Sequence, residues 1–164
     1  MTFFYLFAFL GGSVIIWSIV RGAIYVPTHQ KALARMLDFA EPNARDVMVD
    51  LGAGDGRIVI AFAQHCKEAH GYEHNPLLVW WSRKSIALKK LTNAFIHTKN
   101  FWDVDFSAFH IVIIFGAPHI MKRLEEKLTR EAKPGAKIIS HLFALPTWTP
   151  IKHADGVYLY TPPS

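Results

Sequence analysis

The chain has 164 residues, 51% of them hydrophobic, which is enough apolar content for one hydrophobic core and too little length for a second full domain. Lys and Arg outnumber Asp and Glu by 18 to 13, so an acidic partner is favoured, either an anionic membrane or a nucleic acid. Cys66 is the only cysteine, which excludes an intrachain disulfide and a multi-cysteine metal site. The nine histidines lack the paired spacing on one helical turn that zinc enzymes use, so we expect no metal.

An uncharged apolar run opens the chain and extends from residue 2 to residue 20. Its length is about the 20 residues that a helix needs to cross the hydrocarbon layer of a membrane. A cleavable secretory signal would have a basic start and a shorter apolar stretch, whereas this run has no basic residue before it and is longer. Arg21, Lys31 and Arg35 follow the run, so the positive-inside rule places the rest of the chain on the cytoplasmic or equivalent side. We predict a single-pass transmembrane anchor at 1–21.

A linker and a docking helix are predicted for residues 22–45. Apolar side chains recur at helical spacing over 28–40, with Thr28 as the candidate N-cap and Pro42 ending the segment. The remaining residues, 46–164, form the predicted main domain.

In this domain short apolar runs alternate with helical stretches, a pattern typical of an α/β fold with a mostly parallel sheet. The expected strands are 46–51, 69–73, 94–98, 110–115, 136–143 and 157–160, and the expected helices are 57–66, 76–91 and 118–132. The tail after Phe143 is too short for a further helix and hairpin. We therefore expect a trimmed sheet.

A glycine-rich turn, in the sequence VDLGAGDGR, joins the first predicted strand to the next helix. Nucleotide-like ligands bind at such turns in open α/β sheets. Gly52 and Gly54, on either side of Ala53, let the backbone approach the ligand. Gly56 lets the helix start close to the sheet. A dinucleotide fingerprint needs a third glycine where Arg57 stands, so the pattern disfavours pyrophosphate binding.

Two carboxylates accompany this turn. Asp50, just before Gly52, would repel a pyrophosphate but attract the cationic amino-acid end of S-adenosylmethionine. Glu73 ends the second predicted strand, where a carboxylate can accept both ribose hydroxyls of a nucleoside. Either carboxylate alone also fits a helix cap or a solvated strand end. Together with the turn they predict S-adenosylmethionine as the cofactor.

Several motifs occur in order along the chain: YVPT at 25–28, DLGAGDGRIVIAFA at 50–63, GYEHNPLLVWWSR at 71–83, NFWDVDFS at 100–107 and FGAP at 115–118. In sequence and spacing they resemble the membrane-anchored class I, or seven-β-strand, protein lysine methyltransferases. This family includes the mitochondrial enzymes that modify the c-ring protein of ATP synthase and the adenine nucleotide translocase, together with prokaryotic relatives. The resemblance implies a Rossmann-like S-adenosylmethionine-dependent methyltransferase fold and a protein lysine as the acceptor.

The resemblance also implies roles for particular residues. The cofactor residues that it implies are Asp50, Gly52, Gly54 and Glu73. Thr28 is implied near the methionine end of the cofactor. Asn100 stands where the family often has an aspartate before an aromatic pair, which implies an amide contact to adenine beside Phe101. The turn residues Ala53 and Gly56 complete the predicted cofactor site.

The acceptor side is predicted from the chemistry of methyl transfer, which needs alignment and exclusion of water more than a strong acid or base. A lysine with a solution pKa of about 10.4 must lose a proton, and a low-dielectric aromatic channel promotes this loss. Trp102 and Phe115 are the candidates for that channel, although single aromatic residues more often pack a core. No catalytic acid or base is identified.

The corner FGAPH at 115–119 lacks the Asn or Asp that methyltransferases of adenine or amide nitrogens usually carry there. We therefore expect a protein-lysine N-methyltransferase with a protein substrate in or near the membrane, a lipid bilayer contact through the N-terminal helix, and no nucleic-acid partner. Two alternatives stay open. One is a methyltransferase of a lipid amine or a quinone-like small molecule, and the other is a non-catalytic membrane-tethered binding module.

Overall fold

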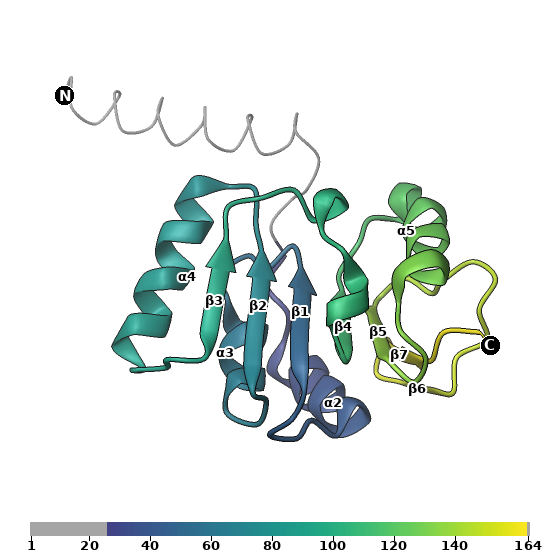
Figure 1. Cartoon of the computed structure of the whole chain (residues 1–164), viewed down its shortest axis with the longest axis horizontal. Coiled ribbons are helices and arrows are strands. Elements are labelled where there is room, and N and C mark those ends of the chain that lie inside the picture. Colours follow the sequence, from purple (N-terminus) through teal and green to yellow (C-terminus); the bar gives the residue numbers. More distant parts are fainter. Residues whose placement is uncertain (1–25, 164) are drawn as a thin grey trace.

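One sheet with helices on both faces organises the chain (Figure 1). The computed structural model describes residues 26–163. The predicted anchor at 1–21 lies outside these residues. Within 26–163, no helix combines the length and the apolar character that a membrane span requires.

The sheet has seven strands in the order β3-β2-β1-β4-β5-β7-β6. They are β1 (Val47–Leu51), β2 (Glu68–Tyr72), β3 (Ala94–His97), β4 (Ile111–Ile114), β5 (Lys137–His141), β6 (Lys152–Ala154) and β7 (Val157–Tyr160). The first five run parallel, and β7 is antiparallel to both β5 and β6. The predicted α/β class, the mostly parallel sheet and all the predicted strands are therefore confirmed.

The prediction of a trimmed sheet is wrong, because the chain end forms a complete hairpin of β6 and β7. The hairpin is short: β6 has three residues, and the turn consists of Asp155 and Gly156. Both turn residues have positive φ values, 55° and 72°, as the tightest hairpin turns require. Asp-Gly is a strong hairpin signal, and it was present in the sequence. In the described residues between β5 and β6 the chain is irregular, so the expected lack of a helix there is confirmed.

The helices divide between the two faces of the sheet. They are α2 (Gln30–Ala40), α3 (Arg57–Ala63), α4 (Pro76–Leu88) and α5 (Pro118–Glu131), with short 3-10 helices η1 (Phe101–Asp103) and η2 (Phe106–Ala108). Buried side chains of α2, α3 and α4 form one core cluster with the sheet. Those of α5 and η2 form a second cluster on the opposite face. Loops follow the carboxyl ends of the parallel strands.

Helix α2 starts later than predicted, because Thr28 is not its N-cap. The capping position belongs to His29, whose side chain makes no capping hydrogen bond. Thr28 is instead buried, and its carbonyl oxygen accepts a hydrogen bond from Arg57 Nη1 at 2.8 Å. The helix packs its buried face, which includes Met36 and Phe39, against β5 and β7. It therefore belongs to the same core as the sheet.

Gly71 in β2 allows the glycine turn and α3 to lie close to the sheet. A Cβ atom at this position would lie 2.6 Å from the Cβ of Ala53 and 2.8 Å from side-chain carbons of both Val59 and Ile96. Such distances are far inside van der Waals contact. The side chains involved are buried and have little room to move.

We predict that Gly71→Ala lowers the free energy of unfolding by about 1–3 kcal/mol, because overpacking a dense core forces backbone or rotamer shifts. Urea denaturation followed by circular dichroism measures the change. Thr92→Ala, an exposed position before β3, is the control and should change stability by less than about 0.5 kcal/mol. Equal stability of the two variants would show that the core adapts to the added methyl group.

Candidate active site

The carboxyl edge of the sheet brings the predicted site residues into one row. Leu51 pairs with Ile114, and Ile114 pairs with Ser140. The residues that follow these three, Gly52, Phe115 and His141, therefore leave β1, β4 and β5 at the same level. The strand order reverses between β1 and β4, and ligands of open α/β sheets bind at such a point.

The glycine turn has the open geometry that a bound ligand needs. The N–H groups of Gly52 and Ala53 both donate to the carbonyl oxygen of Tyr72, at 2.9 and 3.0 Å. Gly52 has φ 90°, and a Cβ there would meet no atom of residues 26–163 within 4 Å. Gly54 also has a positive φ, 55°. Side chains at these glycines would strain the backbone, and at Gly52 the side chain would project into the open space.

Gly56 lies close to α4 as well as to the sheet. It has φ 80°, and a Cβ there would lie 2.8 Å from the Cβ of Ser82 in α4 and 3.8 Å from Cδ1 of Ile96 in β3. The glycine permits α3 to start against α4.

Asp50 is the most unusual group of the site. Its side chain is 1% exposed, and among the described residues neither carboxylate oxygen has a hydrogen-bond partner. Burial, followed by the negative charge of Glu73 and then that of Asp55, raises the pKa of Asp50 to about 8. A buried carboxylate without a partner is costly, and a cationic ligand would offset that cost.

Glu73 joins the end of β2 to the glycine turn. One carboxylate oxygen accepts from Gly54 N–H at 2.9 Å, and the other accepts from the N–H groups of His74 and Asn75 at 2.8 and 2.7 Å. A carboxylate has about four acceptor sites, so three protein donors leave capacity for a ligand hydroxyl. The same side chain thus holds the turn in place, and its contact with a ribose hydroxyl remains a prediction.

Arg57 connects the turn to the segment before α2. Its guanidinium forms a bidentate pair with Asp55, in which Nε donates to Oδ1 at 3.0 Å and Nη2 to Oδ2 at 2.7 Å, and Nη1 donates to the carbonyl oxygen of Thr28. The structure therefore brings Thr28 to the glycine turn, as its predicted cofactor role requires.

The loop after β3 uses its polar and aromatic residues locally. The Asn100 side-chain oxygen accepts from Trp102 N–H at 3.1 Å and caps η1. Phe101 packs on Trp102, with ring centroids 4.9 Å apart. Trp102 lies under Arg123 of α5, with the guanidinium carbon 4.2 Å from the ring centroid. The adenine contact of Asn100 and Phe101 remains a prediction.

The two channel candidates lie against different elements. Trp102 contacts α5, whereas the Phe115 ring lies 4.8 Å from the ring of His141 at the end of β5. Phe115 is at the carboxyl edge, in the position beside Gly52. The channel role of both residues remains a prediction.

Three contributors to the site were not identified from the sequence: Arg57 as a brace, Gly71 as a close-packing position, and His141. His141 is buried, and among the described residues its Nδ1 atom has no hydrogen-bond partner. His141 lies at the end of a strand that the sequence predicts, and this signal places it at the carboxyl edge. The residues next to it depend on strand order, which the sequence pattern does not specify.

The fold and site together define a class I methyltransferase domain: the strand order with its antiparallel β7, the open glycine turn after β1, and acidic residues at the ends of β1 and β2. A family profile described as the ANTKMT methyltransferase domain matches residues 50–152. The chain belongs to this family.

Curated relatives agree with this assignment. The chain is 40% identical over 133 residues to the Homo sapiens lysine N-methyltransferase of the ATP synthase c-ring protein, covering 80% of this chain and 56% of that enzyme. It is 38% identical over 147 residues to a protein-lysine N-methyltransferase of Saccharolobus islandicus, covering 83% of this chain and 91% of that protein. The chain spans between 53% and 61% of the length of the mouse, human and rat relatives it matches.

A solved structure shows the same architecture. An RNA methyltransferase from Salinibacter ruber, in complex with S-adenosyl-L-homocysteine, superposes with a TM-score of 0.78. The two chains are 31% identical, and the match covers 84% of this chain and 94% of the other.

We predict that Asp50→Asn stabilises the ligand-free protein at pH 7 and above. Between about pH 4 and pH 8 the folded chain keeps a proton on Asp50 that the unfolded chain has lost, since the pKa rises from 3.8 to about 8. Stability of the wild type therefore falls as pH rises through this window, by up to about 1.4 kcal/mol per pH unit. The neutral amide removes this contribution.

Urea denaturation at a series of pH values tests the prediction. Asp103→Asn, an exposed carboxylate in η1, is the matched control and should keep the wild-type pH dependence. An Asp50→Asn profile parallel to that of the wild type would contradict the burial argument.

Proposed function

We propose that the protein is an S-adenosylmethionine-dependent protein-lysine N-methyltransferase. The observation that carries the proposal is the buried carboxylate of Asp50, which lacks a partner among the described residues and lies at the start of an open glycine turn. A ligand that joins a cationic group to a nucleoside suits the buried carboxylate and the open turn together. The curated relatives support the lysine acceptor, since their names describe lysine N-methyltransferases of proteins.

The residues at the carboxyl edge fit this cofactor. Asp50 would hold its cationic methionine end, and Glu73 would accept a ribose hydroxyl. Gly52 and Gly54 would let the backbone approach it, with Thr28 near the methionine end and Asn100 and Phe101 near the adenine. When bound, the sulfonium supplies an activated methyl group. The chain aligns the acceptor and excludes water.

A lysine near the bilayer is the acceptor that we favour, with a lipid amine or quinone-like molecule as the alternative. The similarity to an RNA methyltransferase makes RNA a further acceptor to be tested. The short connection between β4 and α5, Phe115 to Ala117, contains no amide or acidic side chain. This composition favours an amine over an adenine or amide nitrogen.

The experiment that tests the function uses the full chain in nanodiscs, methyl-labelled S-adenosylmethionine and a membrane fraction. Protein, lipid and RNA extracts are then counted separately. We expect label in a small hydrophobic protein, and at least a tenfold loss with Asp50→Ala because the cationic end of the cofactor loses its partner. Asp103→Ala should behave like the wild type. Label only in lipid or only in RNA would refute the lysine acceptor.

We also propose that the chain is tethered to a membrane by residues 1–21, with the methyltransferase domain on the cytoplasmic or equivalent side. The uncharged run at 2–20 and the cations after it support the tether. Helix α4 offers separate support. It exposes Leu77, Trp80 and Trp81 at half or more of their surface, although it belongs to a well-packed domain.

The charges of α4 suit anionic lipid headgroups. The helix and the two residues after it contain Arg83, Lys84, Lys89 and Lys90 and no acidic residue. Lys84 Nζ lies 5.1 Å from the centroid of the Trp80 ring. Tryptophan rings beside lysines and exposed leucines are typical of helices that lie at a membrane interface.

We predict that a fluorophore at position 81 enters the interface of nanodiscs that contain anionic lipid. In a Cys66→Ala background, Trp81→Cys and Ile151→Cys provide matched sites, because their parent side chains are 60% and 57% exposed. An environment-sensitive dye should shift to the blue at position 81 only, more with anionic than with neutral lipid. Equal spectra at both sites would contradict the contact. Protection of position 81 by RNA but not by lipid would make α4 a nucleic-acid surface.

A further inference from the structure

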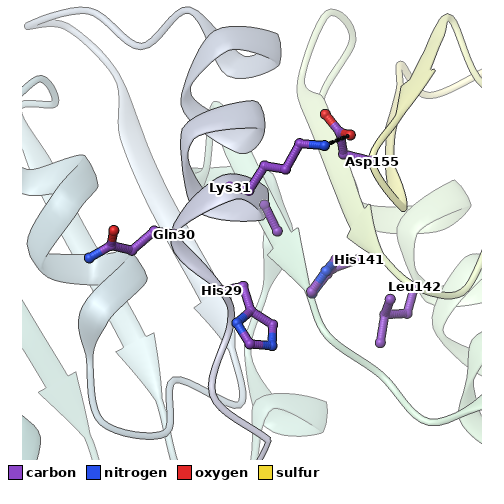
Figure 2. Close-up of a pocket in the computed structure, with 7 residues that line it drawn as sticks. His29, Gln30, Lys31, His141, Leu142 and Asp155 are labelled. Atoms are coloured by element: carbon purple, nitrogen blue, oxygen red, sulfur yellow. Dashed lines mark ion pairs between the residues drawn. The ribbon is translucent and has the colours of Figure 1, made fainter.

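A cavity of about 710 Å³ lies between the start of α2, the end of β5 and the turn of the β6–β7 hairpin. Figure 2 shows His29, from the segment leading into α2, and His141, from the end of β5, on two sides of it. Asp155 of the hairpin turn forms an ion pair with Lys31 at 2.7 Å beside the cavity. The cavity wall thus carries two imidazoles and a paired carboxylate.

His141 is the buried polar group of this wall. Its side chain is 6% exposed, and Nδ1 has no hydrogen-bond partner among residues 26–163. An unsatisfied buried polar atom costs about 1–3 kcal/mol, so its presence calls for a reason such as an absent ligand. The ring of Phe115 lies 4.8 Å away and gives the imidazole an apolar neighbour.

The register of the sheet places this wall next to the cofactor site. Asp50 pairs with Ile113, which pairs with Ile139. His141 follows Ile139 by one full strand period, so its side chain lies on the same face as Asp50. Strands are about 4.8 Å apart, which puts the Cα atoms of Gly52 and His141 roughly 10 Å from each other across β4. An acceptor in the cavity would therefore reach the methyl group from the β5 side.

The imidazole is in the protonation state that a proton acceptor needs. Burial, followed by electrostatic repulsion from His29, lowers the pKa of His141 below its ordinary value. The ring is neutral at pH 7 and carries one nitrogen lone pair. The charged and titratable groups that face it are His29 before α2, Lys31 in α2 and Asp155 in the hairpin turn.

Building on the proposed function, we propose that this cavity receives the acceptor lysine and that His141 takes the proton of its ammonium group at Nδ1. The proton passes from the lysine Nζ to the imidazole. The lone pair that remains on Nζ then forms the new nitrogen–carbon bond, while the carbon–sulfur bond breaks and its electron pair stays on sulfur. Imidazolium releases the proton to water when the product leaves.

His141→Asn tests the step, with His65→Asn at an exposed position after α3 as the matched control. We expect kcat to fall at least 100-fold, as typical for loss of a general base, with the dissociation constant of S-adenosylmethionine changed less than threefold. At saturating S-adenosylmethionine, the inflection of kcat that belongs to His141 should disappear in His141→Asn, and the rate should instead rise steadily with pH toward the pKa of the acceptor lysine. Unchanged kcat, or a His141→Asn profile that keeps the wild-type inflection, would overturn the proposal.

A second measurement does not depend on turnover or on the folding of a variant. Nitrogen-detected NMR of histidine-labelled wild type, saturated with S-adenosylhomocysteine, reports the protonation of His141 Nδ1 directly. Adding a peptide with one lysine should shift the His141 signal, whereas the same peptide with norleucine should not. No difference between the two peptides would refute the lysine site.

The two measurements separate this inference from the proposed function. Protein labelling by the wild type that survives in His141→Asn overturns the role of His141 and leaves the methyltransferase intact. A lysine-specific shift at His141, in a wild type that labels no protein, supports the cavity as a lysine site and refutes the methyl transfer.

Discussion

The structure depends on one electrostatic constraint, a carboxylate buried at the end of β1 without a partner among the described residues. The neighbouring carboxylates disfavour the ionised form of Asp50, because Glu73 and Asp55 add negative charge and help raise its pKa. Both of these carboxylates have donors of their own, from the backbone of the turn and from Arg57. Asp50 is thus the carboxylate of the three that lacks a donor among the described residues, and the open side of Gly52 leaves space for a cation at the same turn.

The segment before and within α2 couples the two halves of the site. Arg57 holds the carbonyl oxygen of Thr28, and the next residue, His29, lines the cavity beside β5. The helix that follows packs into the core against β5 and β7. Two consecutive residues, Thr28 and His29, therefore link the glycine turn to the cavity wall.

The sequence predicts local features of this protein better than features that depend on strand order. The alternation of apolar runs and helical stretches was sufficient to predict the parallel strands. The glycine turn with Asp50 and Glu73 was sufficient to predict the cofactor class, while the contacts of these residues with the cofactor stay predictions. The short tail after Phe143 argues against a hairpin, but the Asp-Gly pair at 155–156 favours one, and in the structure this local turn signal prevails in the β6–β7 hairpin. The place of His141 in the site could not be predicted, because its contact with Phe115 and its position relative to Gly52 depend on strand order. Strand β4 lies between β1 and β5, and a local sequence pattern does not show this order.

The exposed face of α4 and the cavity at β5 belong to the same edge of the domain. Parallel strands end at this edge, and α4 begins there, at Pro76, directly after the end of β2 (Figure 1). Leu77, Trp80 and Trp81 lie in the first turns of the helix, and are therefore near the edge that carries the glycine turn and His141. A domain docked on lipid through these side chains would present its carboxyl edge to the bilayer surface. Because lysines at the ends of membrane helices lie at that depth, the proposed docking would both concentrate the enzyme and orient the cavity toward the proposed acceptor.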